Sequence, residues 1–318
     1  MITNSTQVSY FILSAYFDTG MLKYLYFTII LCLYVLIILS NVFLIVLICV
    51  NRSLHEPMYL FLCSLFVNEL FGSTGLFPFL LFQLLKDLHT VLVSLCFLQI
   101  FCVYSYGCRE FTTLAVMSYD RYLAICHPLQ YHTLMTSTKM SVLITLMWCF
   151  PFLVMAVGIS LSSPLHLCGN IINNVYCNNY SIKLSCSDAK VISIYGLINV
   201  FISMCVPVML IVYTYMRILK VCFSGSKQTR HKAVSTCTPH LASLINFVFG
   251  CVFDIISSRL DMNHVPHTLR IFLSVHFLIC QPIFNPLVYG LKMSKIRNTC
   301  NNLRSGKHHE LNRRAKVQ

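Results

Sequence analysis

Seven long apolar runs, separated by short polar segments, dominate the hydrophobic pattern of this chain. Each run is long enough for a helix to cross the roughly 30 Å of hydrocarbon in a bilayer. Because a backbone in lipid must satisfy its own hydrogen bonds, such runs predict helices rather than open strands. The predicted spans cover residues 24–49, 58–82, 94–122, 139–161, 191–216, 234–257 and 269–291.

The composition agrees with a membrane protein. Of the 318 residues, 57% are hydrophobic and only 10% are charged, whereas soluble domains carry about 25% charged residues. We expect an all-α membrane protein, a seven-transmembrane helix bundle with a short amphipathic helix after the seventh span. Its predicted parts are an extracellular N-terminus (1–23), the bundle (24–291), and a cytoplasmic amphipathic helix and tail (292–318).

The positions of the basic residues predict the orientation. Sixteen of the 23 Lys and Arg residues lie on the side of the C-terminus, and six lie on the other side. The positive-inside rule therefore places the N-terminus outside and the C-terminus in the cytoplasm. The Asn4 glycosylation sequon then falls on the outside. The net charge of +13 is explained by this loop bias, so we expect no nucleic-acid partner.

The sequence contains no pattern for catalysis. There is no CxxC, HExxH, GxSxG or Gly-rich phosphate loop. A transporter would show paired repeat halves, and the sequence shows none. We therefore expect ligand binding and conformational switching, and no enzyme activity.

The stretch from Met117 to Tyr131, MSYDRYLAICHPLQY, places an acid beside a base at the end of the third apolar run. Pro128 disfavours helical geometry at His127, so the helix should end about there. A DR pair alone is explained equally well by a solvated helix end. Together with PMYLFL (57–62), KAVSTCTPHL (232–241) and NPLVYGL (285–291), the stretch resembles the odorant (olfactory) receptor family of rhodopsin-like, class A G-protein-coupled receptors. The resemblance covers about residues 24–300.

The resemblance implies a plasma-membrane receptor that binds a small organic odorant in the outer half of the bundle. It also implies a heterotrimeric G protein partner, expected to be of the olfactory stimulatory type that raises cyclic AMP. The residues implied in coupling and switching are Asp120, Arg121, Tyr122, Tyr215, His240, Asn285, Pro286 and Tyr289. A class A receptor for another small ligand is the nearest alternative.

Helical register predicts which residues face the ligand. They are Val103, Tyr104, Gly107, Cys108 and Phe111 in the third span, and Asn199 and Ser203 in the fifth. The sixth span offers Val252, Ile255 and Arg259. For each residue, packing within the bundle is the alternative. Arg259 could attract a carboxylate-bearing ligand, or could pair with Asp254 or Asp261, or remain solvated.

Several polar residues within the spans need partners. Glu69 and Glu110 should face the interior, either as a sodium site, which the resemblance makes plausible, or as protonated acids in a hydrogen-bond network. No other cofactor is expected. Arg109 has no evident partner, and Asn41 could bond to its own helix or to a neighbour.

The resemblance also implies two disulfides in the outer loops. They are Cys96–Cys177 and, within the second outer loop, Cys168–Cys186. All four cysteines are expected outside the cell, where disulfides persist.

Overall fold

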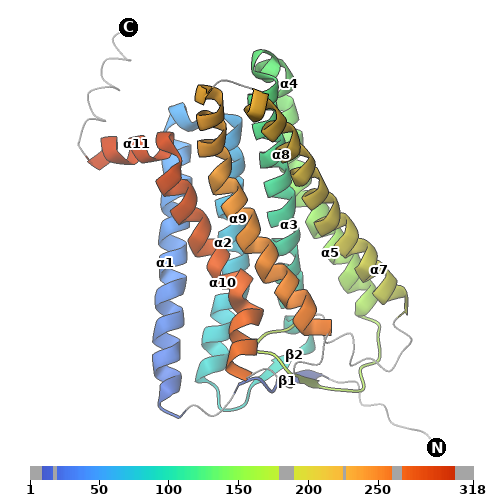
Figure 1. The fold of residues 1–318 in the computed structure, drawn as a ribbon. Helices are drawn as coiled ribbons and strands as arrows, with labels where there is room; N and C mark the ends of the chain where they lie inside the picture. The colour runs from blue at the N-terminus through green and yellow to red at the C-terminus, as the bar shows by residue number, and fades with distance from the viewer. Residues whose placement is uncertain (1–8, 17–19, 179–189, 225–226, 260–266, 305–318) are drawn as a thin grey trace, which may run out of the picture.

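The computed structural model describes residues 9–16, 20–178, 190–224, 227–259 and 267–304, without the side chains of 227–236, 254–259, 267–274, 277, 303 and 304. It confirms the seven-helix bundle (Figure 1). The helices are α1 (Leu22–Val50), α2 (Pro57–Leu85), α3 (Val93–Cys126), α5 (Ser137–Ser162), the continuous helix α7 (Lys190–Val200), η3 (Phe201–Cys205) and α8 (Val206–Ser224), then α9 (Lys227–Arg259) and α10 (His267–Lys292). Every predicted span lies inside one of these helices.

Four described helices are long and apolar enough, by length and composition, to cross a membrane: α1, α2, α5 and the α7–α8 helix. The central helix α3 packs against α2, α5, α8 and α9. It buries Arg109, Glu110 and Asp120 at 1% exposure or less. Because its neighbours shield these side chains, α3 needs less apolar surface than a helix at the edge of the bundle.

Prolines determine local geometry in two places that matter for the site. Helix α3 ends at Cys126, directly before His127-Pro128, as predicted. The π-helical segment η3 lies directly before Pro207. A proline removes one backbone donor and crowds the carbonyl four residues earlier, which belongs to Ser203. The wider turn of η3 accommodates that crowding.

A short helix, α11 (Ser294–Arg304), follows α10 and turns away from the bundle beside α1 (Figure 1). This confirms a helix after the seventh span. Two short segments, η2 (Pro128–Gln130) and α4 (Tyr131–Leu134), connect α3 to α5, and η1 (Arg52–Leu54) connects α1 to α2. We call the end of the bundle that carries α4 and α11 the Arg121 end.

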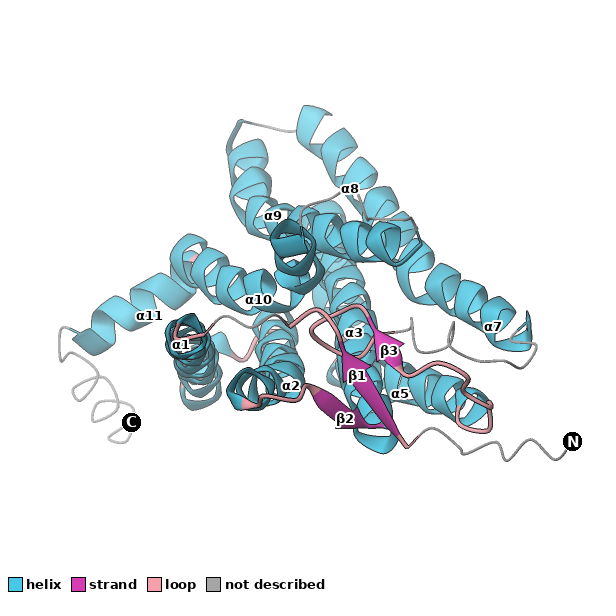
Figure 2. Cartoon of the chain, turned by 90° about the horizontal axis from the view of Figure 1, so that it is seen from below, coloured by secondary structure: helices cyan, strands magenta, loops and turns pink. Residues whose placement is uncertain are grey.

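The opposite end carries a three-stranded sheet, and we call it the sheet end. Strand β1 (Tyr10–Leu13) lies between β2 (Thr90–Leu92) and β3 (Ile171–Ile172). It pairs antiparallel with β2 and parallel with β3. Figure 2 shows the sheet lying across the end of α3. Phe11 and Leu13 point into the protein at 1% exposure, so the sheet is attached to the bundle by apolar contacts.

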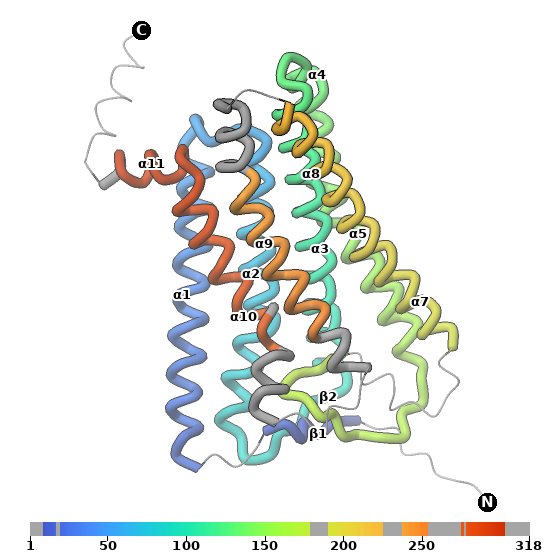
Figure 3. Tube along the Cα trace, viewed as in Figure 1, coloured from blue at the N-terminus to red at the C-terminus, as the bar shows by residue number. Residues whose placement is uncertain are grey.

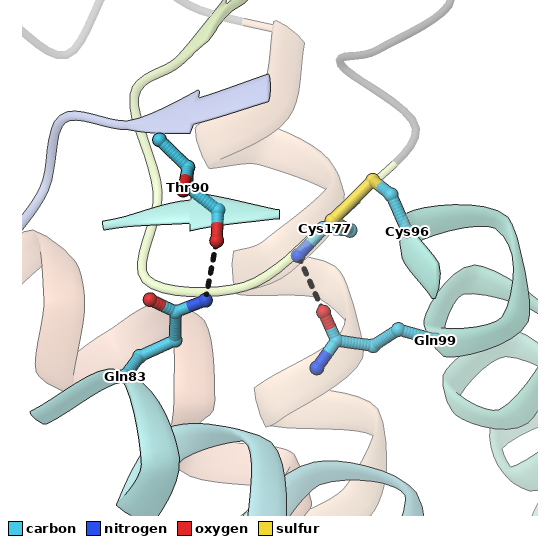
Figure 4. The surroundings of a disulfide bond; sticks show 5 residues. All are labelled: Gln83, Thr90, Cys96, Gln99 and Cys177. Atoms are coloured by element: carbon cyan, nitrogen blue, oxygen red, sulfur yellow. Dashed lines mark hydrogen bonds between the residues drawn. A yellow bond between two sulfur atoms is a disulfide. The ribbon is translucent and has the colours of Figure 1, made fainter. Parts of the chain in front are cut away.

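A disulfide joins the loop after β3 to the start of α3 (Figure 4). It is the predicted bond between Cys96 and Cys177. The Gln99 side chain accepts a hydrogen bond from the Cys177 backbone N–H at 2.8 Å. Cys168 is also disulfide-bonded; its predicted partner, Cys186, lies outside the described residues, as does Asn4.

Candidate functional site

The acid–base pair at the Arg121 end is well defined. Asp120 is fully buried, and Arg121 Nε donates a hydrogen bond to its Oδ2 at 3.1 Å, with a second contact from Arg121 Nη2. The Tyr131 hydroxyl, on α4, donates to Asp120 Oδ1 at 2.7 Å. Burial, and then the Asp120 carboxylate, raise the pKa of the Tyr131 phenol, so it remains a donor. The acid and the base of the motif therefore contact each other, and Asp120 has a second partner, Tyr131, that the motif does not indicate.

A second junction joins three helices near Arg121. The Tyr215 hydroxyl, on α8, lies 2.6 Å from His240 Nδ1, on α9. His240 Nε2 lies 3.0 Å from the Leu114 carbonyl of α3. A carbonyl can only accept, so in a neutral imidazole Nε2 carries the proton and Nδ1 accepts from Tyr215. His240 is fully buried, and this pair of bonds therefore holds α8 and α9 against α3. Tyr122 points elsewhere, with its hydroxyl 3.1 Å from His127 Nε2.

The two acids within the spans, Glu69 and Glu110, lie at the centre of the bundle and are fully buried. The two carboxyl groups are hydrogen-bonded to each other, and their other described hydrogen-bond partners are neutral donors. These donors are the Tyr106 hydroxyl (2.9 Å) and Asn285 for Glu69, and Asn68 (3.1 Å), Gln281 (3.2 Å) and Asn285 (3.0 Å) for Glu110. The Asn285 amide bonds both acids, so the two carboxyl groups lie close together. Two such groups need a shared proton or a bound cation to offset their repulsion.

Helices α9 and α10 join the same network. The Ser243 hydroxyl donates to Asn285 Oδ1 at 2.6 Å, and Asn246 donates to Gln281 at 2.5 Å. On α1, the Asn41 amide donates both to its own helix, at Ile37, and to the Pro282 carbonyl of α10, each at 2.9 Å. Both alternatives for Asn41 therefore hold. The two other residues of α10 implied in switching, Pro286 and Tyr289, are buried. Tyr289 belongs to an apolar cluster with Ile296 of α11.

Arg109 is buried in an aromatic cage. Its guanidinium carbon lies 3.0 Å from the ring centroid of Trp148, and 5.2 Å and 5.3 Å from those of Phe71 and Phe152. Neither terminal nitrogen of Arg109 has a hydrogen-bond partner among the described residues. Cation–π attraction by these rings is the compensation that the structure provides for the buried charge. The Trp148 indole is fixed by a 2.9 Å hydrogen bond to Ser64.

The predicted ligand-facing residues separate into two groups. Val103 and Phe111 lie in a packed apolar cluster with Phe247, Leu278 and Tyr176. By contrast, Tyr104 and Asn199 line a cleft of about 80 Å³ between α3, α5 and α7, together with Phe97, Ile100, Met155, Gly158, Ile159, Ser162, Ile192, Tyr195 and Gly196.

Ser203 and Cys108 lie next to the cleft. The Ser203 hydroxyl donates to Asn199 Oδ1 at 2.7 Å and is also bonded to the Cys108 thiol. An added Cβ at Gly107 would meet no atom within 4 Å, so there is open space beside this residue as well. Val252 is 38% exposed on α9. The side chains of Ile255 and Arg259 lie outside the described residues.

Comparisons with known proteins agree on one family. The family profile described as olfactory receptor matches residues 30–307. Human olfactory receptor 10A6 (Homo sapiens) is 31% identical over 297 residues, covering 92% of this chain and 94% of that protein. Mouse olfactory receptor 6E1 (Mus musculus) is 32% identical over 299 residues, covering 93% and 95%. Among solved structures, squid rhodopsin has the same fold, with a TM-score of 0.70 at 17% identity over 87% of this chain and 84% of that one.

Proposed function

The chain belongs to the olfactory receptor family, and we propose that it binds a small organic odorant at the sheet end and activates a heterotrimeric G protein at the Arg121 end. One observation carries the proposal. A continuous set of hydrogen bonds among Glu110, Gln281, Ser243 and Asn285 joins α3, α9 and α10 between the ligand-facing half and the Arg121 end. A change in helix packing at one end can therefore alter packing at the other.

The switch is a two-state equilibrium of the bundle. In the arrangement described above, Arg121 is held to Asp120, and Tyr215 is held to His240. A ligand that prefers another arrangement shifts the population by its differential affinity, typically by 1–3 kcal/mol. In the active arrangement the base of α9 moves outward, and Arg121, Tyr215 and Tyr289 repack around a helix of the G protein.

The orientation follows from the charges. The Arg121 end faces the cytoplasm, and the sheet end faces outside. The support is the group of basic residues at the Arg121 end, with Arg217 and Lys220 on α8 and Lys292, Lys295 and Arg297 at α10 and α11. A cationic cytoplasmic face suits both anionic lipid headgroups and an acidic G protein surface.

A sodium ion fits the acid pair. Asn68 Oδ1 and Ser73 Oγ are buried and have no hydrogen-bond partner among the described residues, and Ser73 lies one turn from Glu69 on the same helix. Carboxylate, amide and hydroxyl oxygens are the ligands that hard cations prefer. Glu69, Glu110, Asn68 and Ser73 would hold the ion, and its charge would offset the repulsion between the acids.

A cyclic AMP assay tests the proposal. Cells that express the wild-type chain are exposed to volatile and water-soluble odorants, and cyclic AMP is measured beside cells that express Arg121→Ala at equal surface density. We expect a concentration-dependent rise for at least one odorant in the wild type and none in the variant. The G protein proposal fails if Arg121→Ala responds as the wild type does.

A further inference from the structure

Tyr106, on α3, belongs to two sets of contacts at once. Its ring is part of the apolar cluster that includes Phe247 of α9 and Tyr176 of the loop after β3. Its hydroxyl donates to Glu69 Oε2 of α2 at 2.9 Å. Of the donors described for the two acids, Tyr106 alone is a member of that cluster. This side chain therefore joins the apolar cluster at the sheet end to the acid pair.

The Tyr106 ring is held by neighbours on two helices. Helix α3 packs against both α2 and α9, which run beside it through the bundle (Figure 3). On α2, the nearest position is Gly72, where an added Cβ would come within 2.4 Å of the Tyr106 ring carbon Cδ2. On α9, the Phe247 ring meets the Tyr106 ring edge to face, with centroids 6.3 Å apart and planes at 89°. Tyr106 is fully buried, so this close packing leaves the ring little room to move.

The Tyr106 hydroxyl matters because its partner is a buried carboxyl group. Glu69 accepts hydrogen bonds from Tyr106 and Asn285 and is also bonded to Glu110. Removing one donor from a buried acid weakens the arrangement by about fivefold to tenfold in its equilibrium constant. Asn285 is bonded in turn to Ser243 of α9. A displacement of the Tyr106 ring therefore alters the network that joins α2, α9 and α10.

We infer that Tyr106 is the positioning residue that couples the apolar cluster to the acid pair. In the described arrangement, Gly72 and Phe247 hold the ring so that its hydroxyl bonds Glu69. A ligand that displaces Phe247 frees the ring, Glu69 loses a donor, and the resting arrangement becomes less stable. This inference rests on the proposed function, because it assumes that the described arrangement is the resting one. It adds the side chain that couples the two halves and the glycine that makes room for it.

Cyclic AMP without ligand, measured at equal surface density, tests this role. Tyr106→Phe keeps the ring and removes the hydroxyl. The basal level should therefore rise severalfold, up to the roughly tenfold effect of one hydrogen bond. Tyr34→Phe is the matched control, because the Tyr34 hydroxyl joins α1 to α2 by a 3.3 Å bond to Thr74 and not to an acid. It should leave the basal level unchanged.

Gly72 provides a test that a purely structural role would not pass. Gly72→Ala pushes the Tyr106 ring from its place and should also raise basal cyclic AMP. Once Tyr106→Ala has removed the ring, adding Gly72→Ala should cause no further rise, because both changes act through one side chain. Gly75→Ala is the control, since its Cβ would lie 2.8 Å from Cys102 Cβ at the same α2–α3 contact. It should lower the melting temperature without raising basal cyclic AMP.

Phe247→Leu reproduces the loosening of the cluster by a ligand. It removes the ring edge that meets Tyr106 and should raise basal cyclic AMP. Combined with Tyr106→Phe, it should add little, because the hydroxyl through which it acts is already absent. This double-mutant cycle decides the question if Tyr106→Ala does not reach the cell surface.

The outcomes separate the inference from the proposed function. An unchanged basal level in Tyr106→Phe would overturn the inference, as would full additivity of Phe247→Leu and Tyr106→Phe. A rise in Gly75→Ala equal to that in Gly72→Ala would assign the effect to crowding of α2 against α3, and would also overturn it. If an odorant still raises cyclic AMP in the wild type and not in Arg121→Ala, the proposed function stands in each of these cases. If no odorant raises cyclic AMP in the wild type, the proposed function fails and the inference fails with it.

Discussion

The Tyr215 hydroxyl lies 2.6 Å from Nδ1 of His240, and both side chains are buried. Because the other His240 nitrogen bonds the Leu114 carbonyl, this contact joins α8 and α9 to α3. Tyr215→Phe would leave His240 Nδ1 buried without a donor, at a cost of about 1–3 kcal/mol to the described arrangement. We expect cyclic AMP without ligand to rise severalfold. An unchanged basal level at equal surface expression would contradict this role.

Asp120 has two partners, and their removal should have graded effects. Asp120→Asn weakens the contact with Arg121 and should raise basal cyclic AMP strongly. Tyr131→Phe removes only the 2.7 Å hydrogen bond from α4 and should raise basal cyclic AMP less. Leu129→Ala, a change to a residue of the same connection that is 99% exposed, serves as the control. The reverse order of the two variants would mean that Tyr131, and not Arg121, is the main partner of Asp120.

Sodium should stabilise the wild-type receptor through the acid pair. We expect a melting temperature that is a few degrees higher in sodium chloride than in choline chloride of equal ionic strength. Glu110→Gln should abolish this difference. Glu56→Gln, which changes an exposed acid paired with Lys295, should preserve it. A sodium effect that survives Glu110→Gln, or is absent from the wild type, would assign the pair to a shared proton.

The cage around Arg109 predicts that methionine is tolerated better than lysine at this position, although lysine keeps the charge. Lysine keeps the charge but cannot stack as a plane on Trp148, and its ammonium would be buried without a partner. Methionine removes the charge and keeps contact with the rings. Arg109→Lys should therefore lower the free energy of unfolding more than Arg109→Met, by about 2 kcal/mol, and should give the lower melting temperature. Emission from Trp148, the only tryptophan in the chain, gives a direct reading of the contact.

The sheet end should loosen at acidic pH. His89 stacks on Tyr16 with ring centroids 4.5 Å apart, and burial lowers the pKa of His89 from its ordinary 6.5. Once the pH falls below 6.5, His89 in the opened sheet takes up a proton more readily than His89 in the closed sheet. The closed sheet is therefore most stable above pH 6.5 and loses stability as the pH falls below that value. Hydrogen exchange of the β1 amides at about pH 7.5 and about pH 5.5 should show this difference, corrected for the intrinsic rates. His89→Gln should remove it.

The sequence was sufficient for features that a local pattern determines. The seven spans follow from apolar length, the end of α3 follows from Pro128, and the contact between neighbours Asp120 and Arg121 lies within one motif. Helical register worked less well on α3. Because that helix is enclosed by neighbours, Arg109 and Phe111 are both buried, although residues two positions apart point to opposite sides of a helix. Periodicity therefore could not identify the ligand side.

Apart from the disulfide that the resemblance implied, contacts between distant segments could not be predicted. The sheet pairs β1 with strands about 80 and 160 residues later, and these strands are too short for an alternating pattern to show. The cage of Arg109 uses rings from α2 and α5. The pattern of residues along one helix does not show how two other helices are rotated toward it. Tyr176 packs in the bundle next to Cys177, whose disulfide to Cys96 joins this loop to α3.

The central claim is that ligand binding separates α9 from α3 at the Arg121 end. Its most direct test is a distance measurement by pulsed electron resonance between genetically encoded spin labels at Leu129 and Leu241, which are 99% and 36% exposed. With an odorant that raises cyclic AMP, we expect the distance distribution to move outward by several ångströms, and Tyr215→Phe to move part of it without ligand. A distribution that the same odorant leaves unchanged would contradict the account.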